Sequence, residues 1–325
     1  MNNPVAAYKL LRQLRNDLIH IVEYIQPGLQ CKRYHDELKT KIPQWLDLNG
    51  AASGLIRLQE IYKLYPEDIT IETSLNADEA YHVGLVAYYE DKFQHAFLWF
   101  MHSLKSLTAY SSTMMEELLH YLNFSAYYFG SLPQTYFSQQ PLNLDSTTDK
   151  VRLQLNRLLH FLRTSNPDIF ALNPESSRYE TLCRGEINER TSRRQRALSC
   201  RYSTGGGNPR LMYAPVKEEE EWDEPRIIRF HDIISDQEIE ILKNISRPLL
   251  SRSEVFQDGR GAVSKGRVSQ SVFLQDDDPV DALVNQRIAD ATGLSMETAE
   301  LLHVQNYGIG GRYEPHNDAL VSSLY

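Results

Sequence analysis

A long polar stretch, residues 164–224, divides this chain of 325 residues into two parts with different patterns. Three consecutive glycines stand at positions 205–207. Prolines recur along the stretch and at its end, namely Pro167, Pro174, Pro209, Pro215 and Pro225. Glycine and proline at this density exclude a continuous helix. We therefore predict a linker here, with helices before it and a mixed α/β pattern after it.

The first part begins with a heptad pattern typical of a coiled coil. Within residues 5–26, apolar side chains recur at alternating spacings of four and three residues, at Ala7, Leu11, Leu14, Leu18, Ile21 and Ile25. Pro27-Gly28 ends the pattern. It fits a dimerising coiled coil, and it fits equally one amphipathic helix of a bundle, because it spans fewer than three heptads.

Residues 75–163 read as a series of helices, the first of them with Asp78 as its N-cap. Small and aromatic residues follow at the spacing of a tetratricopeptide-like repeat, at Val83, Gly84, Ala87, Ala96 and Phe100. The small residues let two helices approach closely, and we expect Phe100 to fill the gap.

An aromatic stripe follows these helices at helical spacing, with Tyr88, Tyr89, Tyr121, Phe124, Tyr127 and Tyr128. Such a stripe is commonly packed core. Tyrosine also carries a hydroxyl that needs water or a partner, and aromatic grooves suit proline-rich peptides. The sequence leaves both interpretations open.

After Pro225 the pattern is mixed. Residues 226–230 predict a strand, and Ser235 with Glu238 forms a capping box for the helix that follows. Further strands are expected around 267–274 and 300–308, and a glycine-rich turn follows the last of them.

An H-x-D triplet, His316 and Asp318, follows that turn. Residues i and i+2 of an extended segment point to the same side, so the imidazole and the carboxylate converge. They supply two members of the 2-His-1-carboxylate triad that holds Fe(II) in oxygenases. The triplet alone is a weak signal, but the preceding strand and turn favour a metal site.

Composition excludes several classes of protein. With 34 basic and 43 acidic side chains, the net charge is −9, which argues against a nucleic-acid binder and a polybasic membrane-surface protein. No stretch approaches the ~18 apolar residues of a membrane span, and no signal peptide is visible. Among three cysteines, Cys183 and Cys200 are near enough in sequence to pair in an oxidising compartment.

Several segments together resemble the α subunit of collagen prolyl 4-hydroxylase. They are NPVAAYKLLRQLRNDL, LCRGE with RRQRALSCRY, RIIRFHDIISDQEIEILK and TAELLHVQNYGIGGRYEPHNDA. The resemblance implies an α+β chain with a helical dimerisation region at 1–70 and a tetratricopeptide-like peptide-binding domain at 71–165. A linker at 166–224 and the start of a jelly-roll (double-stranded β-helix) dioxygenase domain at 225–325 would follow.

The same resemblance implies a procollagen-proline 4-dioxygenase α subunit that uses Fe(II), 2-oxoglutarate and L-ascorbate in the endoplasmic reticulum lumen. Its substrate would be procollagen or another proline-containing peptide. Its partners would be a second α subunit and protein disulfide isomerase as the β subunit.

Site residues carry over from the family one by one. His316 and Asp318 match the iron ligands, and Tyr307 matches a tyrosine that binds 2-oxoglutarate in related dioxygenases. Cys183 and Cys200 match a structural disulfide. The resemblance assigns no further catalytic side chain.

The peptide-binding positions and the end of the chain depart from the family. Tyr121 and Tyr127 keep aromatic positions, whereas Phe124 replaces a tyrosine. The family's distal histidine ligand and its 2-oxoglutarate-binding lysine lie well downstream of the triplet, and only seven residues follow Asp318. We expect a chain truncated at both ends, an incomplete jelly roll and no activity. The alternative is a non-catalytic peptide-binding and dimerisation module with a vestigial catalytic stub.

Overall fold

The computed structural model describes residues 3–24, 32–108, 115–128, 160, 177–186, 198–257, 260–264, 266–275, 279–314 and 316. The chain divides into two compact units. One is Met1–Glu186 with Ile309–Gly311, and the other is Ile187–Gly308 with Arg312–Tyr325. The first unit is helical over its described part, and the second combines helices with small antiparallel sheets.

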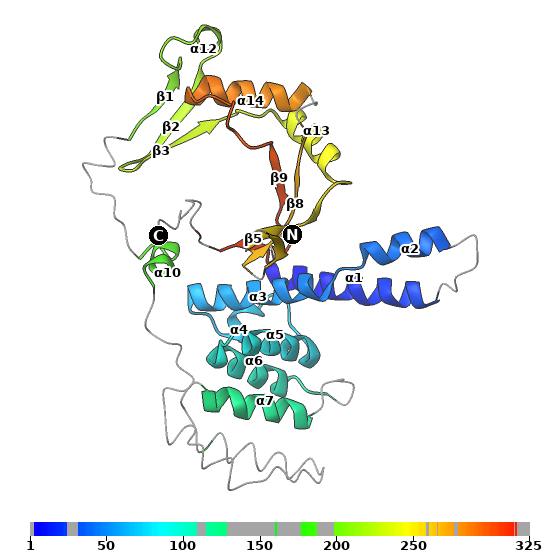
Figure 1. Ribbon diagram of the computed structural model, residues 1–325. Coiled ribbons are helices and arrows are strands. Elements are labelled where there is room, and N and C mark those ends of the chain that lie inside the picture. The colour runs from blue at the N-terminus through cyan, green and yellow to red at the C-terminus, as the bar shows by residue number, and fades with distance from the viewer. Residues whose placement is uncertain are drawn as a thin grey trace, which may run out of the picture. The chain divides into compact units, whose positions relative to one another are not determined.

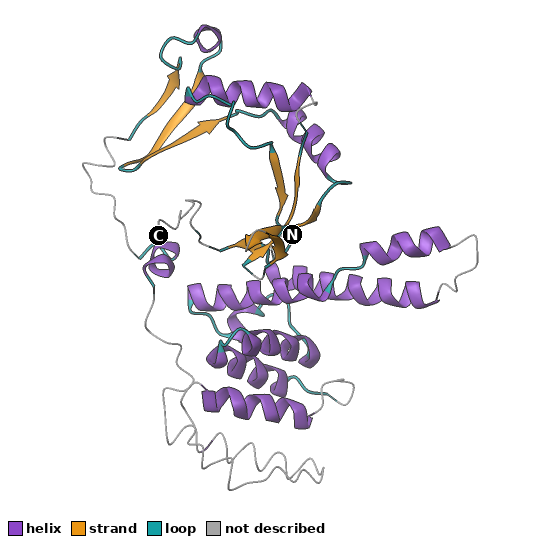
Figure 2. Ribbon diagram, in the orientation of Figure 1, coloured by secondary structure: helices purple, strands orange, loops and turns teal. Residues whose placement is uncertain are grey.

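The helices of the first unit follow one another along the chain (Figure 1). They are α1 (Pro4–Tyr24), α2 (Lys32–Lys41), α3 (Trp45–Tyr62), α4 (Pro66–Ile69), α5 (Ala77–Tyr89), α6 (Phe93–Lys105), α7 (Met115–Tyr128) and α10 (Arg178–Cys183). Helix α3 packs against α5, α5 against α6 and α6 against α7, and Figure 2 shows them side by side. The predicted helical N-terminal region is confirmed.

Helix α5 begins with a capping box formed by Asn76 and Glu79. The Asn76 side chain accepts a hydrogen bond from the Glu79 N–H, and the Glu79 carboxylate accepts one from the Asn76 N–H, both at 2.8 Å. Asp78, which we predicted as the N-cap, is the second residue of the helix. That prediction was wrong because Asn76 is an equally good cap and has its reciprocal partner three residues later.

A glycine sets the contact between α5 and α6. A Cβ atom added at Gly84 would lie 2.6 Å from the Phe100 ring. Ala87, Ala96 and Phe100 are fully buried. The predicted close approach of these two helices, with Phe100 in the gap, is confirmed.

Replacing Gly84 with alanine should therefore destabilise the helical unit. Alanine favours a helix by about 1 kcal/mol over glycine, but overpacking a core costs roughly 1–3 kcal/mol. We expect urea titration to show a net loss of about 1 kcal/mol. In the double variant with Phe100→Leu, the loss should be smaller than the sum of the two single losses, because leucine leaves room for the methyl group. A Gly84→Ala chain as stable as the parent would contradict this account.

Helix α1 is only partly buried in its unit. Tyr8 is fully buried, and Ala7 lies against the core. Further along, Leu14 and Ile21 are 45% and 46% exposed. The first half of the predicted heptad pattern therefore packs within the unit, and the second half leaves apolar side chains on its surface. Ile25 lies outside the described residues.

The described part of the second unit contains antiparallel sheets and three helices. Strands β1 (Cys200–Ser203), β2 (Val216–Asp223) and β3 (Arg226–His231) form one sheet. Strands β4 (Ser251–Arg252), β8 (Gln270–Phe273) and β9 (His303–Asn306) form another. Two pairs join β5 (Glu254–Gln257) to β6 (Arg260–Val263), and β7 (Arg267–Val268) to β10 (Arg312–Tyr313). The helices are α12 (Pro209–Tyr213), α13 (Asp236–Ser246) and α14 (Pro279–Thr292). Over the described residues these sheets form no closed barrel.

Part of the predicted linker is regular structure. Strands β1 and β2 and helix α12 lie within it, and β2 pairs with β3 over most of its length. Glu218 of β2 is buried and accepts hydrogen bonds from Arg201 at 2.5 Å and from Arg226 at 3.2 Å. The acidic run therefore forms a strand because basic residues on both neighbouring strands neutralise it.

Two details of this unit match the sequence-based expectations. Ser235 and Glu238 form the predicted capping box at the start of α13. The strand predicted at 226–230 is β3. Among the described helices, none combines the length and apolar composition needed to cross a membrane.

Candidate functional site

An aromatic face lies along α5, α6 and α7. We define it by Tyr88, Tyr89, Phe93, His120, Tyr121, Phe124, Tyr127 and Tyr128. The centroid of each ring lies within 5.6 Å of another ring of the set. The face brings together side chains from three helices that the sequence separates by up to 40 residues.

Tyr121 joins this face to the core. Its ring stacks on the buried Phe100, with 5.8 Å between centroids, and lies edge-on to Tyr88 at 5.2 Å. Its hydroxyl shares a 3.0 Å hydrogen bond with that of Tyr89. This hydrogen bond, with partial burial, raises the pKa of Tyr121 to about 12. The phenol is therefore neutral at physiological pH and can donate a hydrogen bond.

His120, Phe124 and Tyr128 form an outer row on α7, four residues apart. The Phe124 ring lies 4.6 Å from His120 and 6.2 Å from Tyr128. Phe93 of α6 stacks on Tyr128 at 4.7 Å. Tyr128 is 51% exposed, and Tyr89 is 63% exposed. The outer row, with Tyr89 of α5 beside it, therefore presents aromatic residues to water.

The three residues predicted to bind peptide, Tyr121, Phe124 and Tyr127, lie on α7 and are half-buried. The face combines the two interpretations left open above, because its inner edge is core and its outer edge is exposed. Sequence reasoning missed Phe93 and His120. The four-residue spacing from His120 to Phe124 was a usable signal, whereas only packing brings Phe93 of α6 to the face.

His316, one of the two predicted metal ligands, follows shortly after β10, which pairs with β7. Tyr313 stands directly opposite Arg267 in this pair. The Glu314 N–H donates to the carbonyl of Gly266 at 2.9 Å, which continues the pairing by one residue. Backbone hydrogen bonds therefore hold the chain as far as Glu314, two residues before His316.

The surroundings of His316 fit a metal ligand. Its Nδ1 lies 2.7 Å from the carbonyl oxygen of Glu314. Because a carbonyl only accepts, Nδ1 carries a proton, and Nε2 would be the metal-binding nitrogen of the neutral ring. Metal-binding histidines commonly hold the other ring nitrogen in this way. Asp318 lies outside the described residues, and within the described ranges no cluster of three His, Cys, Asp or Glu side chains could hold a metal.

Tyr307 follows strand β9 and is 46% exposed. Its hydroxyl donates a 2.6 Å hydrogen bond to Oε1 of Gln305. This contact leaves the oxygen able to accept another hydrogen bond. A role in 2-oxoglutarate binding stays a prediction.

Cys183 and Cys200 are both exposed, and each carries a free thiol. Cys183 ends helix α10 and accepts a hydrogen bond from Tyr179, whereas Cys200 begins β1. The two residues belong to different units. The disulfide implied by the family resemblance stays a prediction.

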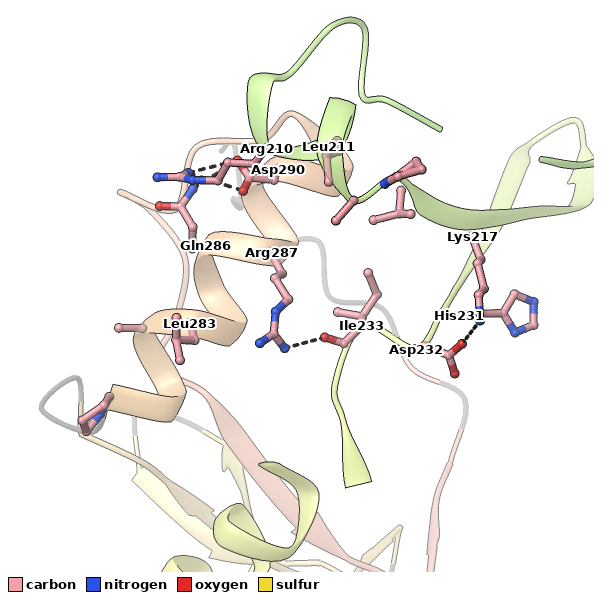
Figure 3. Close-up of a pocket in the computed structure, with 15 residues that line it drawn as sticks. Arg210, Leu211, Lys217, His231, Asp232, Ile233, Leu283, Gln286, Arg287 and Asp290 are labelled. Atoms are coloured by element: carbon pink, nitrogen blue, oxygen red, sulfur yellow. Dashed lines mark hydrogen bonds and ion pairs between the residues drawn. The ribbon is translucent and has the colours of Figure 1, made fainter. Parts of the chain in front are cut away.

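A cavity of about 900 Å³ opens between α12, α14 and strands β2 and β3 (Figure 3). Apolar side chains line much of it, including Leu211, Ile233 and Leu283. Within its lining, Arg210 pairs with Asp290 at 3.4 Å and Lys217 with Asp232 at 2.5 Å, whereas Arg287 pairs with Glu238 outside the lining. None of its lining residues belongs to the predicted iron site.

Comparison with known proteins relates the chain to one family. The family model "Prolyl 4-Hydroxylase alpha-subunit, N-terminal region" matches residues 1–73. The chain is 36% identical to chicken prolyl 4-hydroxylase subunit alpha-2 over 97% of this chain and 66% of that protein. Rat subunit alpha-1 is 35% identical, over 98% of this chain and 66% of that protein. Chicken subunit alpha-1 is 33% identical, over 98% of this chain and 68% of that protein. The chain therefore spans about two thirds of the length of these relatives.

Proposed function

Because this chain belongs to the prolyl 4-hydroxylase α-subunit family, we propose that it is the peptide-recognising and iron-binding part of a procollagen-proline 4-dioxygenase. Such an enzyme hydroxylates peptidyl proline with O2 and 2-oxoglutarate. The observation that carries the proposal is the similarity to named α subunits along nearly the whole chain. The aromatic face and the surroundings of His316 support it, because they offer a surface for peptide and a nitrogen for iron.

In this proposal His316 and Asp318 hold Fe(II). Bound iron and 2-oxoglutarate supply the oxidising chemistry, and L-ascorbate keeps the metal ferrous. His316 offers Nε2, because the Glu314 carbonyl occupies its Nδ1 proton. Tyr307 donates its hydroxyl to 2-oxoglutarate, for which it must release Gln305.

The aromatic face binds the proline-containing peptide. Proline rings pack well on aromatic side chains, and the carbonyl groups of an extended proline-rich chain need donors because proline has no N–H. Tyr89 and Tyr128 supply both a ring and a hydroxyl, and each residue is more than half exposed to solvent. The wider unit is then the tetratricopeptide-like peptide-binding domain at 71–165.

The remaining assignments concern architecture and partners. The region 1–70 dimerises two α subunits, and the exposed Leu14 and Ile21 of α1 support a coiled-coil contact. The linker covers residues 166–224, and residues 225–325 form the N-terminal part of the jelly-roll domain. Protein disulfide isomerase is the β subunit, and the endoplasmic reticulum lumen is the location. In that oxidising compartment Cys183 pairs with Cys200, which peptide mapping without reductant would detect.

Peptide titration tests this proposal. We expect (Pro-Pro-Gly) peptides to bind the chain, and Tyr128→Ala to weaken binding about tenfold, because one aromatic contact contributes roughly 1–2 kcal/mol. Tyr128→Phe should retain most of the affinity. Tyr24→Ala is a matched control, because Tyr24 is 89% exposed on α1 and outside the aromatic face. Equal affinity of the parent and the Tyr128→Ala chain in isothermal titration would exclude the face as the peptide site.

A further inference from the structure

We propose that Tyr313 and Arg267 are positioning residues for His316, and that a stack of their three side chains sets the plane in which the imidazole meets a metal ion. This inference rests on the proposed function, because it takes His316 to be a metal ligand. The juxtaposition that carries it is the layering of a guanidinium, a phenol and an imidazole beside strands β7 and β10.

The strand pairing places Arg267 and Tyr313 together. They are direct partners in the antiparallel register of β7 and β10. Directly opposite side chains on one face of such a pair lie in contact. Arg267 places its guanidinium carbon 4.8 Å from the centroid of the Tyr313 ring. Its NH1 group also donates a 2.9 Å hydrogen bond to the carbonyl of Glu254. The first layer of the stack is therefore anchored to a different strand, β5.

Tyr313 forms the middle layer. Its ring centroid lies 3.8 Å from that of His316, and the two planes are inclined by 24°. A ring held between a cation and an imidazole cannot turn freely about its χ angles without losing one of these contacts. The plane of the imidazole therefore depends on Tyr313 and, through it, on Arg267.

A second constraint acts on the same imidazole. The hydrogen bond from Nδ1 to the Glu314 carbonyl fixes its rotation within the plane. That carbonyl belongs to a residue whose own N–H is paired with Gly266. The stack constrains the plane and the hydrogen bond constrains the rotation, so both act on where Nε2 points. Groups outside the ligand set that orient a metal-binding histidine typically change metal affinity 10- to 100-fold when removed.

The test uses the full chain labelled with ¹³C,¹⁵N-histidine and titrated with Mn²⁺. Paramagnetic broadening of the His316 ring signals gives an apparent Kd even where binding is weak, and His316→Ala identifies these signals. We expect Tyr313→Leu to raise the Kd about tenfold. Tyr313→Phe keeps the ring and should stay within twofold of the parent. Arg267→Met keeps the length of the side chain but removes its charge, and should raise the Kd several-fold.

The outcomes separate this inference from the proposed function. If Mn²⁺ broadens the His316 signals of the parent but Tyr313→Leu and Arg267→Met leave the Kd unchanged, the positioning role is overturned and the metal site stands. If the parent chain shows no broadening at His316, the proposed iron site fails and this inference fails with it. If Tyr313→Leu does not fold, Arg267→Met decides. The ¹⁵N chemical shifts of His316 give a second readout, because they report which ring nitrogen carries the proton. A substitution that only weakens the fold would leave this protonation pattern unchanged.

Discussion

At pH 4.5 the helical unit should be about 5 kcal/mol less stable than at pH 7, because two of its histidines are held neutral. Half-buried His82 and His95 each have a pKa lowered to about 4. An imidazole in the unfolded chain titrates near 6.5, so the unfolded chain binds the protons more tightly. The stability is complete above pH 6.5, decreases as the pH falls, and levels off below pH 4. Each histidine contributes about 2.5 kcal/mol over this window.

The contacts of His82 explain its resistance to protonation. Burial lowers its pKa most, and the charge of Arg12 adds to the effect. Its Nε2 donates to Oδ1 of Asn49 at 3.0 Å, so Nδ1 must accept the hydrogen bond of the Tyr8 hydroxyl at 2.8 Å. That hydroxyl also accepts from Arg12 at 3.2 Å. A proton on Nδ1 would remove the acceptor of the hydrogen bond that links α5 to Tyr8 of α1.

His95 lies in a different environment. Burial again has the largest effect on its pKa. Glu60 and, less strongly, Glu180 raise the pKa and so oppose the effect of burial, whereas Lys92 and Lys63 lower it. Its Nδ1 is buried and, over the described residues, has no hydrogen-bond partner. A charged imidazole here would gain no compensating bond.

Urea titrations at pH 7 and pH 4.5 measure this dependence. The variants His82→Gln and His95→Gln should each remove roughly half of the acid-induced loss, because glutamine does not titrate. Both variants are compared with the parent by the change in unfolding free energy between the two pH values, which cancels any constant cost of the substitution. The account is wrong if neither variant makes this change smaller.

Replacing Trp99 with alanine should destabilise the helical unit by about 5 kcal/mol. Trp99 is fully buried on α6, and truncating such a side chain costs roughly 3–5 kcal/mol. Its Nε1 donates a 3.0 Å hydrogen bond to Oε1 of Gln59, which is itself fully buried. Losing that donor leaves a buried carbonyl unsatisfied, which costs about 1–3 kcal/mol more. The variant should therefore also lose peptide binding, since the aromatic face rests on α6 through Phe100.

Trp45 offers the matched control for this experiment. It is 60% exposed, and its ring contacts Arg15, whose guanidinium carbon lies 4.4 Å away, and His82, at 6.0 Å between centroids. Trp45→Ala should cost about 1 kcal/mol or less. Thermal and urea unfolding measure both variants. A Trp99→Ala chain no less stable than the Trp45→Ala chain would refute the role of Trp99 in the core.

A second test separates the hydrogen bond from the packing. In Trp99→Phe most of the apolar ring is kept but the donor to Gln59 is lost. Combining it with Gln59→Leu removes the orphaned amide and should recover part of the stability, as in a double-mutant cycle. Since Nε2 of Gln59 has no hydrogen-bond partner in the described structure, the leucine substitution removes one unsatisfied group in either background.

Local patterns predicted the features that depend on residues a few positions apart. Gly84 and the alanines after it predicted two closely packed helices, because only small residues permit such a close approach. Ser235 and Glu238 predicted the start of a helix, because a capping box involves residues only three positions apart. The predicted cap of α5 was wrong by two residues because Asn76 and Asp78 are comparable caps. The choice depended on the Glu79 carboxylate, which accepts a hydrogen bond from the backbone N–H of Asn76.

Features that depend on contacts between distant segments could not be predicted from the sequence. The run of four glutamates at 218–221 looked like a solvated part of a linker, but Arg201 and Arg226 make it the central strand of a sheet. The placement of Tyr121 against Phe100, and the contribution of Phe93 to the aromatic face, required the packing of α6 against α7.

The sequence by itself determined the family, the helical character of the first unit and the H-x-D triplet with its glycine turn, because each is written in spacings along one segment. Only the tertiary structure decided which tyrosines lie in the core and which are exposed, and which ring nitrogen of His316 donates to the Glu314 carbonyl. It also decided that Tyr313 and Arg267 stack beside that imidazole. These properties arise where side chains from separate strands and helices meet, and burial and hydrogen bonding at such contacts depend on the whole fold.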